Sequence, residues 1–234
     1  MRMSNWLVRG AMKLGQMMVA LIVFVAPAQA IVIENFDSPL DSLYFSFSDI
    51  GPIAFAQTTS ADAGIAAPTG QSTSDPILSF DVPDAVFAGV GRNFYDTLGT
   101  GYAGSQDWSV ASGVQFWLYG SGLGTTMRLS LLDTDSTFAG ELWLNDFVDD
   151  QTGWRLVELS FSDFYNAPYS VINDNVFNLD TIYSWALLGV DGVSAGTYYI
   201  EDIELTPVPA PASFLLLVMG LLSLALSRRS VPRR

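Results

Sequence analysis

Three residues of one short predicted strand could together bind a sugar. Trp143 lies two positions from Glu141 and two from Asn145, and the strand period of two places all three side chains on one face. A flat aromatic ring can stack on a sugar ring, while carboxylate and amide groups can bracket its hydroxyl groups with paired hydrogen bonds. We therefore interpret this strand face as a candidate carbohydrate-binding surface.

A neighbouring strand could extend this surface. If residues 126–133 form a hairpin with residues 141–147, Arg128 points the same way. Trp117 and Tyr119 would add two aromatic rings, provided that their strand belongs to the same sheet. The alternative, that these two rings pack under a loop or against the edge of the other sheet, stays open. The predicted carbohydrate-binding residues are Trp117, Tyr119, Arg128, Glu141, Trp143 and Asn145.

The residue types that are missing exclude most catalytic chemistry. The chain has no histidine and no cysteine, which rules out a Ser-His dyad, a His-ligated zinc, a thiolate nucleophile and a disulfide framework. Two carboxylates can hydrolyse a glycoside. However, nothing in the sequence marks any of the 24 acids as one held in an apolar pocket with a raised pKa. We therefore expect a protein without enzymatic activity.

Residues 31–206 are dominated by a period of two. Apolar and polar residues alternate, as in strands that cover a core with one face, along residues 43–48, 114–119, 127–132 and 157–161. Turns rich in Gly and Asp separate these segments, and no amphipathic helix of three turns is apparent. Residues 56–75, rich in Ser, Thr, Ala and Gly, predict a long surface loop. The predicted fold is an all-β domain, an antiparallel β-sandwich or jelly roll.

The first 30 residues have the parts of a secretory signal. Three basic residues precede an apolar core at residues 17–25, and Ala28-Gln29-Ala30 forms a small-x-small cleavage site. This order predicts a signal peptide over residues 1–30, with signal peptidase as a processing partner.

The last residues, 207–234, combine three features. Alternating prolines come first, an uncharged apolar run of fifteen residues (Ala212–Leu226) follows, and arginines end the chain. At about 1.5 Å per residue the run spans only about 22 Å, which predicts a short transmembrane helix over residues 212–227. The arginines would keep the end of that helix on the cytoplasmic side. The predicted sorting residues are Pro207, Pro209, Pro211, Arg228 and Arg229.

This order of parts resembles the PEP-CTERM sorting signal of Gram-negative bacteria, which an exosortase recognises and cleaves. One difference is that Ala210 stands where the family has a Glu between its prolines. The resemblance implies export through the inner membrane and transient anchoring by the C-terminal helix. Exosortase is then the second implied processing partner, and the protein is expected at the cell surface or in the extracellular matrix.

The charge of the middle of the chain agrees with export. Seven of the ten basic residues lie in the two ends, so the positive-inside rule places the middle outside the cytoplasm. Residues 31–206 hold three arginines and all 24 acids, a formal charge of −21. Such a domain repels nucleic acid and attracts divalent cations, among which Ca²⁺ prefers oxygen ligands.

A second resemblance rests on the order of motifs from Asp107 onward. These are DWS before a strand, FW in a strand that ends in GSG, GW before an alternating strand and SDF, and YIEDI near the end. The order resembles the galactose-binding-like jelly rolls, particularly the family-eleven carbohydrate-binding modules. In that fold the first and last strands lie together and often hold a structural Ca²⁺. The resemblance implies a calcium site formed by Glu34, Asp37 and Asp202. The alternative, that these three are ordinary charged residues at the edge of the sheet, stays open.

Two functions from different classes follow. The chain is an exported surface protein with a non-catalytic carbohydrate-binding module that engages exopolysaccharide. Alternatively, it is a structural or adhesive matrix protein in which the same sandwich has no sugar site. The exposure of Trp117, Tyr119 and Trp143 on one sheet face would favour the first function.

Overall fold

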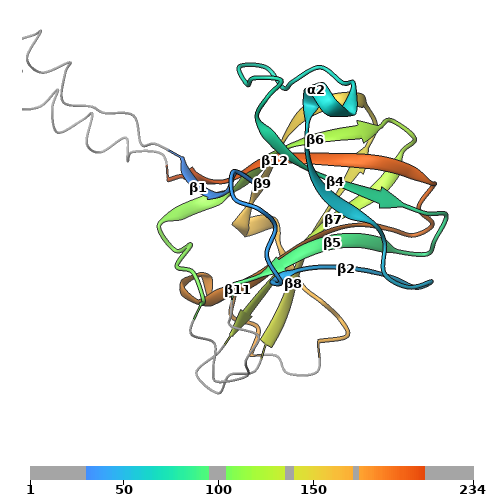
Figure 1. Cartoon of the computed structure of the whole chain (residues 1–234). Helices are drawn as coiled ribbons and strands as arrows, with labels where there is room; N and C mark the ends of the chain where they lie inside the picture. Colours follow the sequence, from blue (N-terminus) through green and yellow to red (C-terminus); the bar gives the residue numbers. More distant parts are fainter. Residues whose placement is uncertain (1–29, 95–103, 135–139, 171–173, 209–234) are drawn as a thin grey trace, which may run out of the picture. The chain divides into compact units, whose positions relative to one another are not determined.

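Figure 1 shows the computed structural model, which describes residues 30–94, 104–134, 140–170 and 174–208. These residues form a two-sheet sandwich in which all strand pairs are antiparallel. Sheet A has the order β3-β4-β12-β6-β9, and β1 pairs with β12. Its strands are β1 (Ile31–Glu34), β3 (Phe55–Thr59), β4 (Pro76–Val82), β6 (Ala111–Ser121), β9 (Thr152–Ser160) and β12 (Gly196–Pro207).

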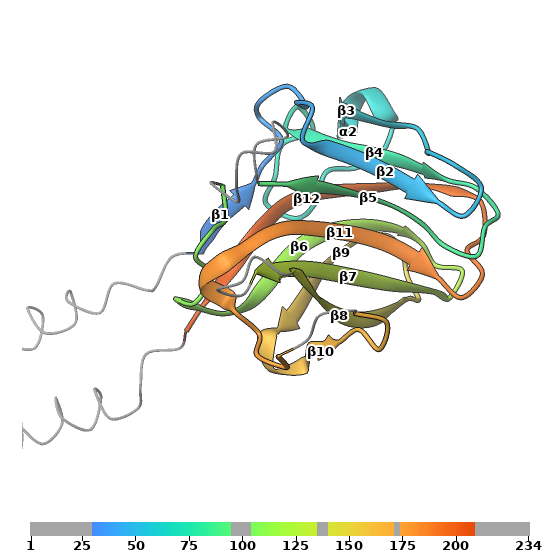
Figure 2. The same ribbon diagram turned by 90° about the horizontal axis from the view of Figure 1, so that it is seen from below.

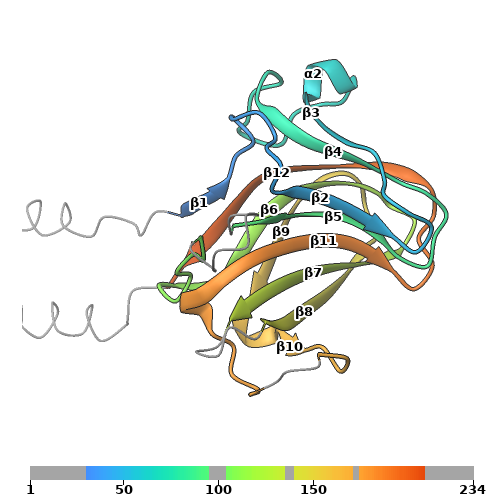
Figure 3. The ribbon, with the colours of Figure 1, turned by 60° about the horizontal axis from the view of Figure 1, so that its bottom comes forward.

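Sheet B has the order β10-β8-β7-β11-β5-β2, which can be followed in Figure 3. Its strands are β2 (Tyr44–Ser48), β5 (Ala88–Asn93), β7 (Thr125–Thr134), β8 (Gly140–Asp149), β10 (Tyr165–Asn166) and β11 (Ile182–Val190). The helical segments among the described residues are short: α2 (Ser60–Ala63), η1 (Phe161–Asp163) and η2 (Leu179–Thr181). The predicted all-β antiparallel sandwich is confirmed.

The core lies between the two sheets; in Figure 2 the strands of sheet B, among them β2, β11 and β7, overlap those of sheet A. In β6 of sheet A, buried Val114, Phe116 and Leu118 alternate with half-buried residues. In β7 of sheet B the buried apolar residues include Met127 and Leu129. Alternation along these two strands therefore assigned their core faces correctly, because a pleated strand turns successive side chains to opposite sides.

The long surface loop that the sequence predicts over residues 56–75 is shorter in the structure. Residues Phe55–Thr59 pair with β4 as strand β3. The Thr59 hydroxyl then accepts a hydrogen bond from the backbone N–H of Asp62 at 3.1 Å and caps α2. Only the residues that follow α2, up to β4, form the loop. Composition misled the prediction here, because the edge strand is rich in the same small polar residues as the loop.

Several predictions concern the two ends of the chain. The signal peptide, the C-terminal helix and the sorting residues Pro209, Pro211, Arg228 and Arg229 lie outside the described residues. Pro207, also predicted as a sorting residue, is the last residue of β12, opposite Ala111 of β6. Within the part of the chain that the structure describes, no helix is long and apolar enough to cross a membrane.

Trp143 lies in the core, so its predicted exposure on the surface is wrong. In the β7–β8 hairpin Leu131 lies opposite Trp143, and Arg128 lies opposite Asp146. Odd-numbered residues therefore share the inner face of both strands, and even-numbered residues share the outer face. Trp143 is 8% exposed, and its ring stacks on that of Phe177 with centroids 4.7 Å apart.

The two residues that flank Trp143 face inward with it. Glu141 is 1% exposed and Asn145 is 7% exposed, opposite the inward-facing Asp133 and Leu129 of β7. The prediction placed these odd-numbered residues beside the even-numbered Arg128. That placement requires a pairing register shifted by one residue, and such a shift turns every side chain to the other face.

We expect Trp143→Ala to destabilise the domain by about 3–5 kcal/mol, because it removes a buried aromatic ring and leaves a cavity. Trp117→Ala is the matched control, since Trp117 is only half-buried and lies on the outer face of sheet A. Urea unfolding of the two variants measures the difference. A loss for Trp143→Ala no larger than that for Trp117→Ala would contradict the core assignment.

Candidate functional site

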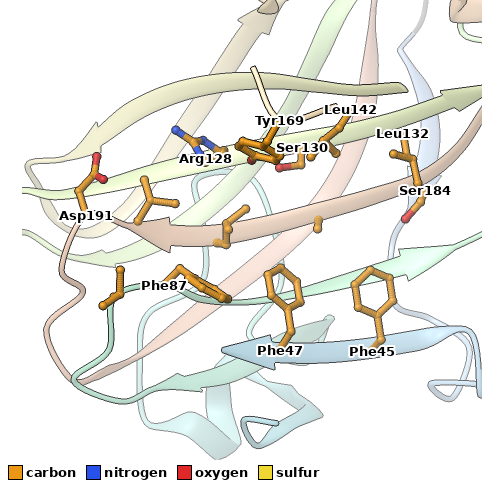
Figure 4. Close-up of a pocket in the computed structure, with 14 residues that line it drawn as sticks. Phe45, Phe47, Phe87, Arg128, Ser130, Leu132, Leu142, Tyr169, Ser184 and Asp191 are labelled. Carbon is orange, nitrogen blue, oxygen red and sulfur yellow. The ribbon is translucent and has the colours of Figure 1, made fainter. Parts of the chain in front are cut away.

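The outer face of sheet B carries a groove of about 640 Å³. Its lining residues come from β2, β7, β8 and β11 and from connecting segments, so that distant parts of the chain meet there (Figure 4). Nine of the fourteen have hydrocarbon side chains: Phe45, Phe47, Val86, Phe87, Leu132, Leu142, Ala186, Leu188 and Val190. The polar ones are Arg128, Ser130, Tyr169, Ser184 and Asp191.

Strand β11 forms the floor of the groove, because it lies between β7 and β5 within sheet B. Its outward residue Ala186 lies opposite Ser130 of β7 on one side and Gly91 of β5 on the other. Leu188 likewise lies opposite Gly89. Ser130, Gly89 and Gly91 have small side chains or none. They therefore leave space for a ligand over this part of the sheet, between the larger side chains on either side.

Phenyl rings form one wall of the groove. The rings of Phe45 and Phe47 are stacked, with centroids 5.9 Å apart, and Phe87 lies 6.3 Å from Phe47. A Cβ atom added to Gly91 would lie 2.7 Å from Cζ of Phe45. The phenyl ring thus occupies space that a larger β5 residue would fill. In Figure 4 both rings of β2 point toward β11.

A hydrogen-bonded polar cluster adjoins the groove where β7 and β8 pair. Arg128 donates from Nε to Oδ1 of Asp146 at 2.6 Å and from Nη2 to Oδ2 at 2.8 Å. The Tyr165 hydroxyl donates to Oδ2 of Asp146 at 2.9 Å and accepts from Nη2 of Arg128 at 3.2 Å. The hydrogen bonds from Arg128 lower the pKa of Asp146, so the carboxylate is charged at neutral pH and the pair has no net charge.

Trp117 and Tyr119 point outward as predicted, but they do so from β6 of sheet A. Tyr199 of β12, Tyr119 and Trp154 of β9 lie opposite one another in register, with ring centroids 5.6 and 5.5 Å apart. The indole N–H of Trp154 donates to the carbonyl of Ala66 at 2.5 Å, so the loop after α2 reaches this aromatic row. The loop therefore contacts Trp154, the ring neighbour of Tyr119, and the alternative that Trp117 and Tyr119 pack under a loop stays open.

The six predicted carbohydrate-binding residues therefore do not form one surface. Trp117 and Tyr119 belong to the outer face of sheet A, and Glu141, Trp143 and Asn145 to the interior. Of the six, Arg128 is the residue that lines the groove.

The predicted calcium ligands lie near β1 and β12, which pair as expected. Among the described residues, no three acidic side chains lie close enough to hold one metal ion. Glu34, 8% exposed, forms an ion pair with Arg92. Burial, followed by the charges of Glu204, Asp75 and Asp37, raises the pKa of Asp202 to about 6. A cation would relieve this repulsion, and calcium binding stays a prediction.

A family model described as "Carbohydrate binding domain (family 11)" matches residues 23–207. The chain belongs to this family. Its membership supports a sugar-binding domain. A comparison with curated protein sequences gives no match.

Solved structures of family-11 and family-30 modules share the jelly-roll fold of this family-11 chain. The family-11 module of the cellulosomal cellulase Lic26A-Cel5E of Clostridium thermocellum has a TM-score of 0.57 at 14% identity and covers 80% of this chain and 99% of its own. A family-11 module from the same organism, in complex with a β-1,3-1,4-mixed-linked tetrasaccharide, has a TM-score of 0.57 at 14% identity, with coverage of 80% and 100%.

The family-30 module of the cellulase Cel9D-Cel44B of Clostridium thermocellum has a TM-score of 0.54 at 14% identity, with coverage of 78% and 100%. At such low identities these likenesses concern the fold alone.

The aromatic residues of the groove in this family-11 domain were missed from the sequence. Alternation over residues 43–48 groups Phe45 and Phe47 on the apolar face of a strand, yet Tyr44, 9% exposed, is the residue that joins the core. The signal that could have revealed this arrangement is the pair Gly89 and Gly91, because alternate glycines on a strand leave space for rings from a neighbouring strand.

If an ion binds at Asp202, millimolar Ca²⁺ should raise the melting temperature of the chain, because a ligand that binds only the native state stabilises it by mass action. A gain of 1 kcal/mol corresponds to about 2–4 °C in a domain of this size. Asp202→Asn should remove the response, because it removes the carboxylate that would bind the ion. The backbone should be unaffected, since Asn tolerates the positive φ of 48° found at this position. The control is Asp180→Asn, an exposed acid in η2. Identical melting curves with Ca²⁺ and with a chelator would exclude the site.

Proposed function

We propose that the groove on sheet B binds a polysaccharide chain and that the domain acts as a non-catalytic carbohydrate-binding module. The observation that carries this proposal is the combination of an open apolar groove with a charged, hydrogen-bonded rim in a family-11 chain. The C–H faces of pyranose rings pack on phenyl rings such as those of Phe45 and Phe47. Hydroxyl groups at the edge of the sugar can hydrogen-bond to the Arg128–Asp146–Tyr165 cluster.

The electrostatics of the acids favour binding over hydrolysis. Glycoside hydrolysis needs an acid whose pKa is raised so that it can protonate the leaving group. Burial raises the pKa of Asp133 to about 6 and of Glu201 to about 7. Both are buried and neither lines the groove. The Asp146 carboxylate beside the groove has a lowered pKa, because Arg128 donates hydrogen bonds to it. We therefore propose that the ligand is held and not cleaved.

Phe47→Ala and Tyr169→Ala should each weaken polysaccharide binding about tenfold, because an aromatic contact to a sugar contributes on the order of 1–2 kcal/mol. Affinity electrophoresis in gels that contain mixed-linked β-glucan or glucomannan measures the change. Trp117→Ala serves as the control, because its indole lies on sheet A. Loss of binding in Trp117→Ala with normal binding in Phe47→Ala would move the site to sheet A. Binding by none of the proteins would favour a structural matrix function.

We further propose that the two ends of the chain direct the export and the anchoring of the domain. The signal peptide would direct export through the inner membrane, and the PEP-CTERM-like tail would hold the protein there until exosortase processes it. The acidic domain, with its formal charge of −21, would then reach the cell surface or matrix, where exopolysaccharide is the available ligand.

Truncation after Val208 should release the protein into the periplasm, since the tail that the processing enzyme reads is gone while β12 stays complete. Fractionation followed by immunoblotting of the surface, membrane and periplasmic pools tests this expectation. The matched control replaces Arg228 and Arg229 with Lys, which keeps the positive charge. A truncated protein found at the cell surface in normal amounts would contradict the sorting role.

A further inference from the structure

The lining of the groove has few groups that could replace the water around a sugar hydroxyl. Phe45, Phe47 and Phe87 form one wall, and Ala186 and Leu188 form the floor. A hydroxyl group turned toward these side chains loses its hydrogen bonds to water and finds no new partner, which is unfavourable. The lining therefore favours a ligand that presents carbon-bound hydrogen over much of its surface.

Three polar side chains of the groove, Arg128, Ser184 and Tyr169, are already engaged or stand away from its floor. Arg128 uses Nε and Nη2 for Asp146. The hydroxyl of Ser184 donates to the carbonyl of Arg92 at 3.1 Å. Tyr169 is 60% exposed, so its hydroxyl serves the solvent-facing side of a ligand. A sugar chain lying in the groove would meet hydrogen-bonding groups mainly along its outer edge.

Charge argues against an acidic ligand. All three arginines between residues 31 and 206 are paired with acids: Arg92 with Glu34 and Asp41, Arg128 with Asp146, and Arg155 with Asp150. The formal charge of this part of the chain is −21. A carboxylated or sulfated polysaccharide would therefore be repelled and would find no unpaired arginine to bind.

We propose that the groove selects a neutral polysaccharide that carries O-acetyl groups. An acetyl ester replaces a hydroxyl hydrogen with a methyl group and a carbonyl. The methyl group gains from burial against side chains such as Phe47 and Leu188. The carbonyl only accepts hydrogen bonds, and the hydroxyl groups of Ser130, beside the floor, and Tyr169, at the outer edge, can donate to it. This inference rests on the proposed function, since it names the class of ligand for the same groove.

Acetylated glucomannan and its alkali-deacetylated form are suitable probes, because they differ only in the ester groups. Isothermal titration of the purified full-length chain should give tighter binding of the acetylated form. We expect a factor of about four for each methyl group that is buried.

Leu132→Asn tests whether the lining sets this preference. The substitution places an amide of similar size at a half-buried position of the groove and offers partners to a free hydroxyl. The ratio of the two affinities should fall toward one, through tighter binding of the deacetylated form. Leu156→Asn, at a 41% exposed position on the outer face of sheet A, is the matched control and should leave the ratio unchanged.

The outcomes separate this inference from the proposed function. Equal or tighter binding of the deacetylated form, with binding still sensitive to Phe47→Ala, overturns the preference for acetyl groups but keeps the polysaccharide site. Binding of neither form, or binding that Phe47→Ala leaves intact, overturns both. A ratio that changes in Leu156→Asn and not in Leu132→Asn overturns the inference, because selection then takes place on sheet A.

Discussion

The register in which β7 pairs with β8 determines which residues of sheet B face the core and which face the groove. Leu131 lies opposite Trp143, and Arg128 lies opposite Asp146. The first pair packs inside, where Trp143 stacks on Phe177, and the second forms an ion pair on the outer face. A shift of one residue would move either the indole into water or the guanidinium into the core. Both the core and the groove depend on this one register.

The same register positions the segment that covers Trp143. Asp133 and Glu141, opposite each other in the hairpin, are both buried. The backbone N–H of Asn178 donates to Oδ2 of Asp133 at 2.7 Å, and that of Asp174 donates to Glu141. Burial of these carboxylates is unfavourable, and their hydrogen bonds to backbone N–H groups offset part of the cost. Together they hold the chain on either side of Phe177, which lies over the indole.

The two outer faces of the sandwich differ in what covers them. On sheet A the loop after α2 reaches across the strands, where the Ala66 carbonyl accepts from Trp154 and Gln71 donates to Asp202 at 2.5 Å. On sheet B the phenyl rings of β2 stand beside a low floor built from residues such as Ala186, which leaves a groove. Sheet B therefore offers a recess for a ligand, whereas sheet A carries the row of Trp and Tyr side chains.

The sequence by itself determined the all-β fold, because period-two alternation along short segments such as residues 114–119 is a local property of strands. Composition likewise excluded His- and Cys-based catalysis. Only the tertiary structure decided which face of each strand is buried. Alternation defines the two faces of a strand but does not say which of them is buried. Which face is buried depends on the pairing between strands and on the size of side chains in neighbouring strands. Trp143 therefore lies inside, whereas Phe45 and Phe47 lie outside, above the glycines of β5.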